Sequence, residues 1–141
     1  MTHHCRLIRR LALAVSMVLA LAVAAVPAGA DAFQFRAGTF VGKTSLDGGK
    51  IELRMERKSS GLYVRHIVLK GSFECYGYAE DVDIDRYVLG GKVGARGAFK
   101  IPDADVTLRG RYVTSGRIEG SLVAKTLSCD SPLQHFGARR R

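Results

Sequence analysis

The stretch KIELRMERK, Lys50 to Lys58, alternates apolar and charged side chains. Ile51, Leu53 and Met55 lie on one side of an extended chain, and the charged residues between them lie on the other. Successive side chains of a β-strand leave opposite faces, so this strict alternation predicts a half-buried strand. This stretch decides the fold class, because a helix would place apolar residues three or four positions apart instead.

The rest of the chain after residue 30 repeats this pattern between turn signals. Asp47-Gly48-Gly49 predicts a tight turn, because glycine accepts the positive φ of hairpin turns. This turn would pair the strand over 50–58 with residues 39–45. Further strands are predicted at 62–70, 73–78, 80–85, 92–101, 106–113, 118–124 and 133–139. Seven to nine short strands predict an all-β fold, either a small antiparallel β-sandwich or a small β-barrel.

A glycine precedes a large apolar residue by two positions at several places, as in Gly38-Thr39-Phe40, Gly110-Arg111-Tyr112 and Gly120-Ser121-Leu122. Residues two apart in a strand share a face, so such a glycine leaves space for a bulky neighbour or a bend. The copies are irregularly spaced, which is not typical of a repeat array. We interpret them as features of the fold, not as a ligand-binding repeat.

The N-terminus has the three-part layout of a secretory signal. A basic head with Arg6, Arg9 and Arg10 precedes an apolar run from Leu11 to Val26, and Ala28-x-Ala30 follows as a cleavage motif. Residues 1–30 are therefore predicted to be a signal peptide with a signal helix. The alternative is an uncleaved membrane anchor, because the apolar stretch is just long enough to span a bilayer.

Cleavage after Ala30 would leave one exported domain, residues 31–141, with a short basic C-terminal tail. These 111 residues contain 19 Lys and Arg against 13 Asp and Glu, a net charge of +6. Arg139, Arg140 and Arg141 supply half of that excess. The folded body is then only mildly basic, well short of the dense basic face expected of a nucleic-acid-binding domain, so we expect no nucleic-acid partner.

The exported domain contains two cysteines, Cys75 and Cys129. An even pair in an oxidising compartment predicts a disulfide. Their separation would close a long loop and stabilise the fold by roughly 4 kcal/mol. The alternative, a reactive or metal-binding thiol, lacks CxxC spacing and a nearby histidine.

Asp81-x-Asp83-x-Asp85 places three carboxylates on one face of a predicted strand. Oxygen-rich clusters suit calcium, but Arg86 and Lys92 stand where an EF-hand loop needs glycine and glutamate. We interpret the three aspartates as a solvated strand face that pairs with Arg109 or Arg111. No metal and no cofactor are predicted.

The exported domain has two histidines, His66 and His135, and neither lies in a known catalytic or metal-binding motif. His66 alternates with Val64 and Val68, so it is predicted to be a hydrogen-bonded sheet histidine. We expect no enzyme activity. A convergent pair of His66 and a carboxylate in a cleft would favour catalysis after all.

Six arginines are candidates for contact with an anionic surface: Arg109, Arg111, Arg117, Arg139, Arg140 and Arg141. The first three are predicted to line the outer face of the hairpin over 106–124, and the last three form the basic tail. Together they would hold the protein on anionic cell-wall polymers or lipid headgroups. The alternative is an ordinary charged, soluble surface with a disordered end.

Several short motifs resemble those of small exported all-β proteins of GC-rich, actinobacterial-type bacteria. They are an opening Gly-x-aromatic-x-Gly-Lys, a mid-chain Cys75, the Gly110 to Leu122 hairpin, and Cys129 followed by an aromatic-x-Ala-Arg end at Phe136 to Arg139. That aromatic is usually tryptophan in the relatives, and Phe136 departs from this pattern. The resemblance implies export, a β fold and a bridge between Cys75 and Cys129, but no activity.

From these observations we expect an exported, non-catalytic, monomeric β domain that binds the cell envelope or remains in the extracellular space. The alternative is a secreted small barrel that acts as an enzyme inhibitor or small-ligand carrier. An exposed, ordered loop with aromatic and polar side chains would favour inhibition. A cavity of several hundred Å3 lined by apolar side chains would favour a carrier.

Overall fold

The computed structural model describes residues 35–141, and these residues form eight β-strands without a helix. The strands are β1 (Gly38–Thr44), β2 (Asp47–Lys58), β3 (Gly61–Cys75), β4 (Tyr78–Tyr87), β5 (Ala98–Pro102), β6 (Val106–Thr114), β7 (Arg117–Ala124) and β8 (Gln134–Arg140). Residues 35–141 contain no helix long and apolar enough to cross a membrane. The predicted signal peptide, residues 1–30, lies outside the described residues.

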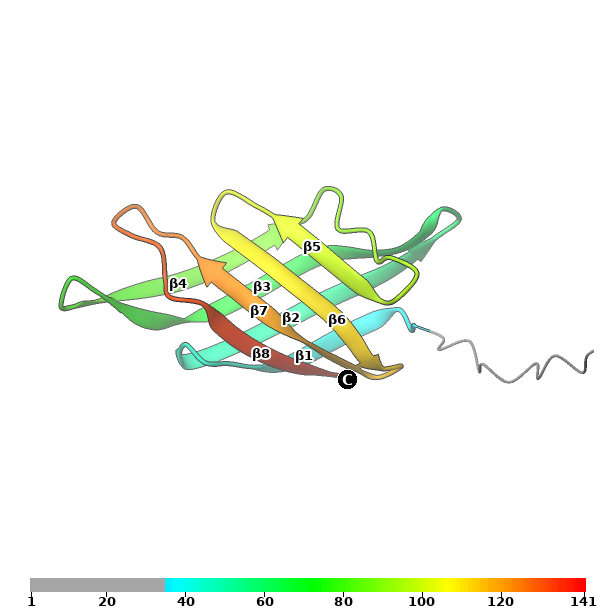
Figure 1. Cartoon of the computed structure of the whole chain (residues 1–141), viewed down its shortest axis with the longest axis horizontal. Coiled ribbons are helices and arrows are strands. Elements are labelled where there is room, and N and C mark those ends of the chain that lie inside the picture. The colour runs from blue at the N-terminus through cyan, green and yellow to red at the C-terminus, as the bar shows by residue number, and fades with distance from the viewer. Residues whose placement is uncertain (1–34) are drawn as a thin grey trace, which may run out of the picture. The chain divides into compact units, whose positions relative to one another are not determined.

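All eight strands belong to one antiparallel sheet with the order β4-β3-β2-β1-β8-β7-β6-β5. Every neighbouring pair is consecutive in sequence except β1 and β8, which join the two halves of the sheet at its middle. The sheet curls so that β5, β6 and β7 lie across β2, β3 and β4 (Figure 1). The architecture is therefore a half-barrel, not two separate sheets, and its edges are β4 and β5.

One hydrophobic core fills the inside of the curl. The first half of the sheet contributes fully buried side chains such as Ile51, Leu53 and Ile67, and the second half contributes Leu108 and Ile118. In β2 the buried and exposed positions alternate, as the Lys50–Lys58 sequence predicts. Burial of these apolar side chains from both halves is what holds the curled sheet together, because removing apolar surface from water is the main favourable term in folding.

The all-β prediction and the expected number of strands are confirmed, with corrections at two places. The strands predicted over 62–70 and 73–78 are merged into one 15-residue strand, β3, which ends at Cys75, because its ladder with β4 continues through Gly71 and Ser72. The turn comes later, at Tyr76 and Gly77, which both have positive φ as a two-residue hairpin requires. The predicted strand over 92–101 is also shorter, because Gly94 and Gly97 form a turn before β5.

Two contacts outside the ladder connect the two halves of the sheet. Arg86 of β4 forms ion pairs with Asp103 and Asp105, which lie in the turn between β5 and β6. At the end of the sheet where β3 turns into β4, the sulfur atoms of Cys75 and Cys129 lie at the bonding distance of a disulfide, 2.05 Å. Cys129 is in the loop between β7 and β8, so this link joins the two halves of the curl.

Tyr112 closes the other end of the core. Its ring packs edge-on against Phe40, with the centroids 5.5 Å apart, and its hydroxyl donates a hydrogen bond to the carbonyl oxygen of Arg36 at 2.6 Å. The side chain is almost fully buried, and burial raises the pKa of Tyr112 well above its usual value. The phenol is therefore held in its neutral form.

Two glycines make room for aromatic rings inside the sheet, as their spacing in the sequence predicts. Gly110 and Gly120 face each other across β6 and β7. A Cβ atom on Gly110 would lie 2.3 Å from the ring of Phe99, and one on Gly120 would lie 2.7 Å from the ring of Phe136. The absence of a side chain at these positions is therefore a packing requirement.

We expect Gly110→Ala to lower the free energy of unfolding by roughly 1–3 kcal/mol, the usual cost of overpacking a core. The matched control is Gly137→Ala, because nothing lies within 4 Å of a Cβ atom at that position. Urea denaturation monitored by circular dichroism measures both variants. Equal stability of the two would show that the ring of Phe99 does not need the space at Gly110.

Removal of the link between Cys75 and Cys129 is expected to destabilise the fold. The two residues are 54 positions apart, and in the chain-entropy model a crosslink over such a loop contributes roughly 4 kcal/mol. The double variant Cys75→Ser, Cys129→Ser should unfold at lower urea concentration than the oxidised protein. A mass measurement with and without a thiol-alkylating reagent verifies the bond, and an unchanged midpoint would contradict its structural role.

Tyr112 should make stability depend on alkaline pH. Its pKa is raised in the folded state, so above about pH 10 the unfolded chain releases a proton that the folded chain retains. The free energy of unfolding then falls as pH rises, by up to about 1.4 kcal/mol per pH unit. Tyr112→Phe removes this dependence, so the stability difference between the two proteins should shrink between pH 9 and pH 11 in urea titrations. A constant difference would contradict the assignment.

Candidate basic site on the outer face

The outer face of the second half of the sheet gathers cationic side chains. In β6, Arg109 and Arg111 point away from the core, because Leu108, Gly110 and Tyr112 between and beside them point inward. The strand register then places Lys100 of β5 next to Arg109. On the other side of β6, Ser121 of β7 lies opposite Arg109, and His135 of β8 lies opposite Ser121. A continuous row of Lys100, Arg109, Ser121 and His135 crosses four strands.

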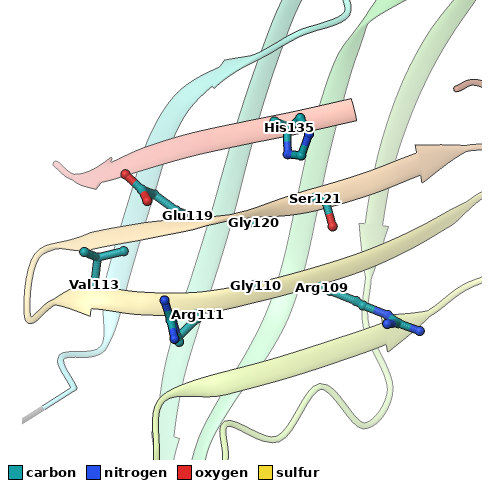
Figure 2. Close-up of a pocket in the computed structure, with 8 residues that line it drawn as sticks. All are labelled: Arg109, Gly110, Arg111, Val113, Glu119, Gly120, Ser121 and His135. Carbon is teal, nitrogen blue, oxygen red and sulfur yellow. The ribbon is translucent and has the colours of Figure 1, made fainter. Parts of the chain in front are cut away.

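A shallow depression of about 430 Å3 lies on this face (Figure 2). The backbone of Gly110 and Gly120 forms its floor. Its sides are Arg109, Arg111, Val113, Glu119, Ser121 and His135. Because Gly110 and Gly120 face inward, they present only backbone to the outer face, and the flanking outward side chains rise around them.

The charges in and around this depression are not balanced. Glu119 is the one carboxylate among its lining residues, and it forms an ion pair with Arg117. Arg109 and Arg111 have no ion-pair partner within residues 35–141. A second depression next to the first shares Arg111 and Val113 and adds Arg96. Guanidinium groups in this arrangement, with a hydroxyl and an imidazole, suit oxyanions such as phosphate or carboxylate.

The structure brings four of the six predicted arginines to this face. Arg109 and Arg111 line the depression, while Arg117 and Arg139 lie opposite each other on neighbouring strands beside it. Arg140 does not join them, because it alternates with Arg139 in β8 and comes within 2.8 Å of a Cβ position on Gly38, near Tyr112. Arg141 follows β8 and donates its backbone N–H to Thr39.

The predicted basic tail is largely absent. Arg139 and Arg140 belong to β8, which lies in the middle of the sheet and pairs with β1 and β7. Val41 of β1 and Arg117 of β7 are the neighbours of Arg139. Sequence reasoning predicts a strand up to Arg139 but cannot find this pairing, because the partners are far away along the chain.

The three aspartates Asp81, Asp83 and Asp85 do share the outer face of β4, as predicted. Their predicted pairing with Arg109 or Arg111 is wrong, because those arginines belong to the other half of the sheet. Asp83 instead lies 3.4 Å from Lys70, and Asp85 lies 2.7 Å from Nε2 of His66. Within residues 35–141, no group of three His, Cys, Asp or Glu side chains is arranged to hold a metal ion.

His66 has a partner, as expected of a sheet histidine. Its Nε2 forms a hydrogen bond with Oδ1 of Asp85, and its ring centroid lies 4.7 Å from that of Tyr87. The His66 and Asp85 pair lies on the outer face of β3 and β4, outside the depressions described above. Sequence reasoning also leaves His135 without a role, and the structure places it in the basic depression.

A further groove of about 390 Å3 lies along the free edge of β4. Asp81, Val82, Asp83 and Ile84 form one side of it. The turn between β5 and β6 contributes Ala104 and Asp105, and the loop between β7 and β8 contributes Lys125, Thr126 and Leu127. This groove differs from the basic depression in the sign of its charge.

Comparisons of the chain with protein-family models, with curated proteins and with solved structures find no match. The assignment of a function therefore rests on the geometry and chemistry of these surfaces.

Proposed function

We propose that this chain is an exported, non-catalytic β domain that binds anionic groups of the cell envelope through the outer face of β6, β7 and β8. The observation that carries the proposal is the pair of guanidinium groups, Arg109 and Arg111, which lack an ion-pair partner in the described part of the chain. The signal-like N-terminus supports the location. The partners would be anionic cell-wall polymers or lipid headgroups, which share phosphate and carboxylate chemistry.

The shape of the depression supports a polymer or a surface more than a small enclosed ligand. Its floor is backbone, its sides include the long flexible side chains of Arg109 and Arg111, and it opens to solvent along the sheet. Small-molecule sites are usually concave, largely apolar and able to enclose their ligand. The charged lining of this depression and of the β4 groove likewise does not favour an apolar-ligand carrier.

One observation favours the second candidate, enzyme inhibition. Tyr76 and Tyr78 are 86% and 76% exposed on the turn between β3 and β4, and the link between Cys75 and Cys129 fixes the base of that turn. Tyr76 adopts a φ of 52°, a conformation that bulky residues rarely accept. Exposed tyrosines on an ordered turn are typical of protein-binding surfaces.

The test is salt-titrated binding to isolated cell walls and to vesicles that contain an anionic phospholipid. The double variant Arg109→Gln, Arg111→Gln should bind roughly tenfold to thirtyfold more weakly than the unmodified protein, since each arginine at an anionic surface contributes about 1 kcal/mol. Binding should also weaken as salt is raised, because salt screens exposed charges. Comparison of the two matrices distinguishes cell-wall polymer from lipid headgroup.

The matched control is the double variant Lys58→Gln, Lys92→Gln, which removes the same net charge from exposed positions near the turn between β2 and β3. It should bind almost as well as the unmodified protein. Deletion of the last three residues is not a suitable control, because Arg139 and Arg140 are part of β8. If the unmodified protein is retained on neither matrix at low salt, the proposal falls.

A further inference from the structure

The free edge of β4 is long and has no partner strand among residues 35–141. β4 has ten residues, and β3 is its one partner strand among residues 35–141. The backbone groups on its other side have no hydrogen-bond partner in the described part of the chain as far as Asp85. The opposite edge, β5, is only five residues long and ends at Pro102. The carbonyl oxygen of its first residue, Ala98, already accepts a hydrogen bond from the backbone N–H of Gly94. Short length and proline are the usual means of protecting an edge strand.

The free edge opens into the β4 groove defined above. Arg86 fills the gap beyond Asp85, because its guanidinium group reaches across to Asp103 and Asp105. The accessible part of the edge is therefore Tyr78 to Ile84, which lies opposite the loop between β7 and β8 (Figure 1). Leu127 in that loop is fully exposed, so an apolar contact is available across the groove.

We propose that this edge binds an extended basic segment of a partner protein, which adds to the sheet as a strand beside β4. Main-chain hydrogen bonds to a free edge supply affinity in this mode of recognition, and alternate side chains supply specificity. The inference does not depend on the anionic-surface proposal, which concerns the other half of the sheet, so the two can fail separately.

The residues of β4 specify the pattern of that segment. Asp81 and Asp83 face outward, while Val82 and Ile84 between them face the core side. Side chains directly opposite in neighbouring strands lie about 5 Å apart. An added strand would therefore place basic residues beside the aspartates and apolar residues beside Val82, Ile84 and Leu127. Of the carboxylates in the groove, Asp83 and Asp105 already form ion pairs with Lys70 and Arg86. Asp81 has no ion-pair partner among residues 35–141, and its free carboxylate favours a basic occupant.

The same aspartates argue against a second copy of this chain as the occupant. Antiparallel pairing of two β4 edges would bring two alternating rows of aspartates together, and like charges directly opposite each other are destabilising. Pairing of β4 with β5 of another copy would use an edge that is short and ends in proline. The acidic edge thus resists self-association while it remains open to a cationic strand.

The test uses a fluorescent peptide of alternating lysine and valine, long enough to pair with Tyr78 to Ile84. We expect saturable binding by fluorescence anisotropy and slower amide hydrogen exchange in β4. A peptide with glutamate in place of lysine should not bind. A peptide methylated on every backbone nitrogen should also not bind, because it cannot donate ladder hydrogen bonds. Equal binding of either control peptide, or no binding of the lysine peptide at low salt, would overturn the proposal.

Variants of the protein test the position of the site. Asp81→Asn with Asp83→Asn should weaken peptide binding about fivefold, the effect of two exposed charge pairs. The matched control is Asp47→Asn with Glu52→Gln, which removes two charges from β2 and should leave binding within twofold. Analytical ultracentrifugation of the protein alone tests for self-association. If the protein dimerises and Asp81→Asn with Asp83→Asn strengthens the dimer, the occupant of the edge is a second copy and the proposal is overturned.

Discussion

The fold depends on the contact between two halves of one sheet whose edges do not meet in a ladder. Closed barrels hold their strands together by hydrogen bonds around the whole circumference. Here the ladder stops at β4 and β5, so the buried side chains of both halves must hold the curl closed. The ion pairs of Arg86 act at the gap itself, and the covalent link from Cys75 to Cys129 joins the end of β3 to the loop between β7 and β8. The incomplete closure also creates the β4 groove. The same break in the ladder therefore makes the fold depend on its core and leaves the edge of β4 accessible.

The strands were predictable from the sequence wherever one face is buried and the other is solvated. Lys50–Lys58 and Val106–Thr114 alternate so regularly that periodicity alone defines them. The length of β3 was not predictable, because Gly71 and Ser72 interrupt the apolar pattern between two predicted strands although they continue the ladder. Four of the six arginines share the predicted outer face, but the role of His135 was missed. Its contact with the depression depends on the pairing of β7 with β8, which no local pattern encodes.

The outer faces of β6 and β4 carry opposite charge. Arg109, Arg111 and Lys100 face outward on one half, and Asp81, Asp83 and Asp85 face outward on the other. The net positive charge of the chain is therefore unevenly distributed over the sheet. The β6 face suits an anionic partner and the β4 edge suits a cationic one. One small sheet can in this way present two independent binding surfaces.

The pairing of β1 with β8 has a consequence for how the chain folds. Phe40 pairs with Arg140, so the first and last strands meet across almost the whole described sequence. Contacts between such distant residues give a high contact order, and folding is correspondingly slow. The two four-strand units, β1–β4 and β5–β8, can form early, but they cannot join until the last residues are available. A chain that stops early would leave β1 and β7 as bare edges, which makes incomplete products prone to aggregation.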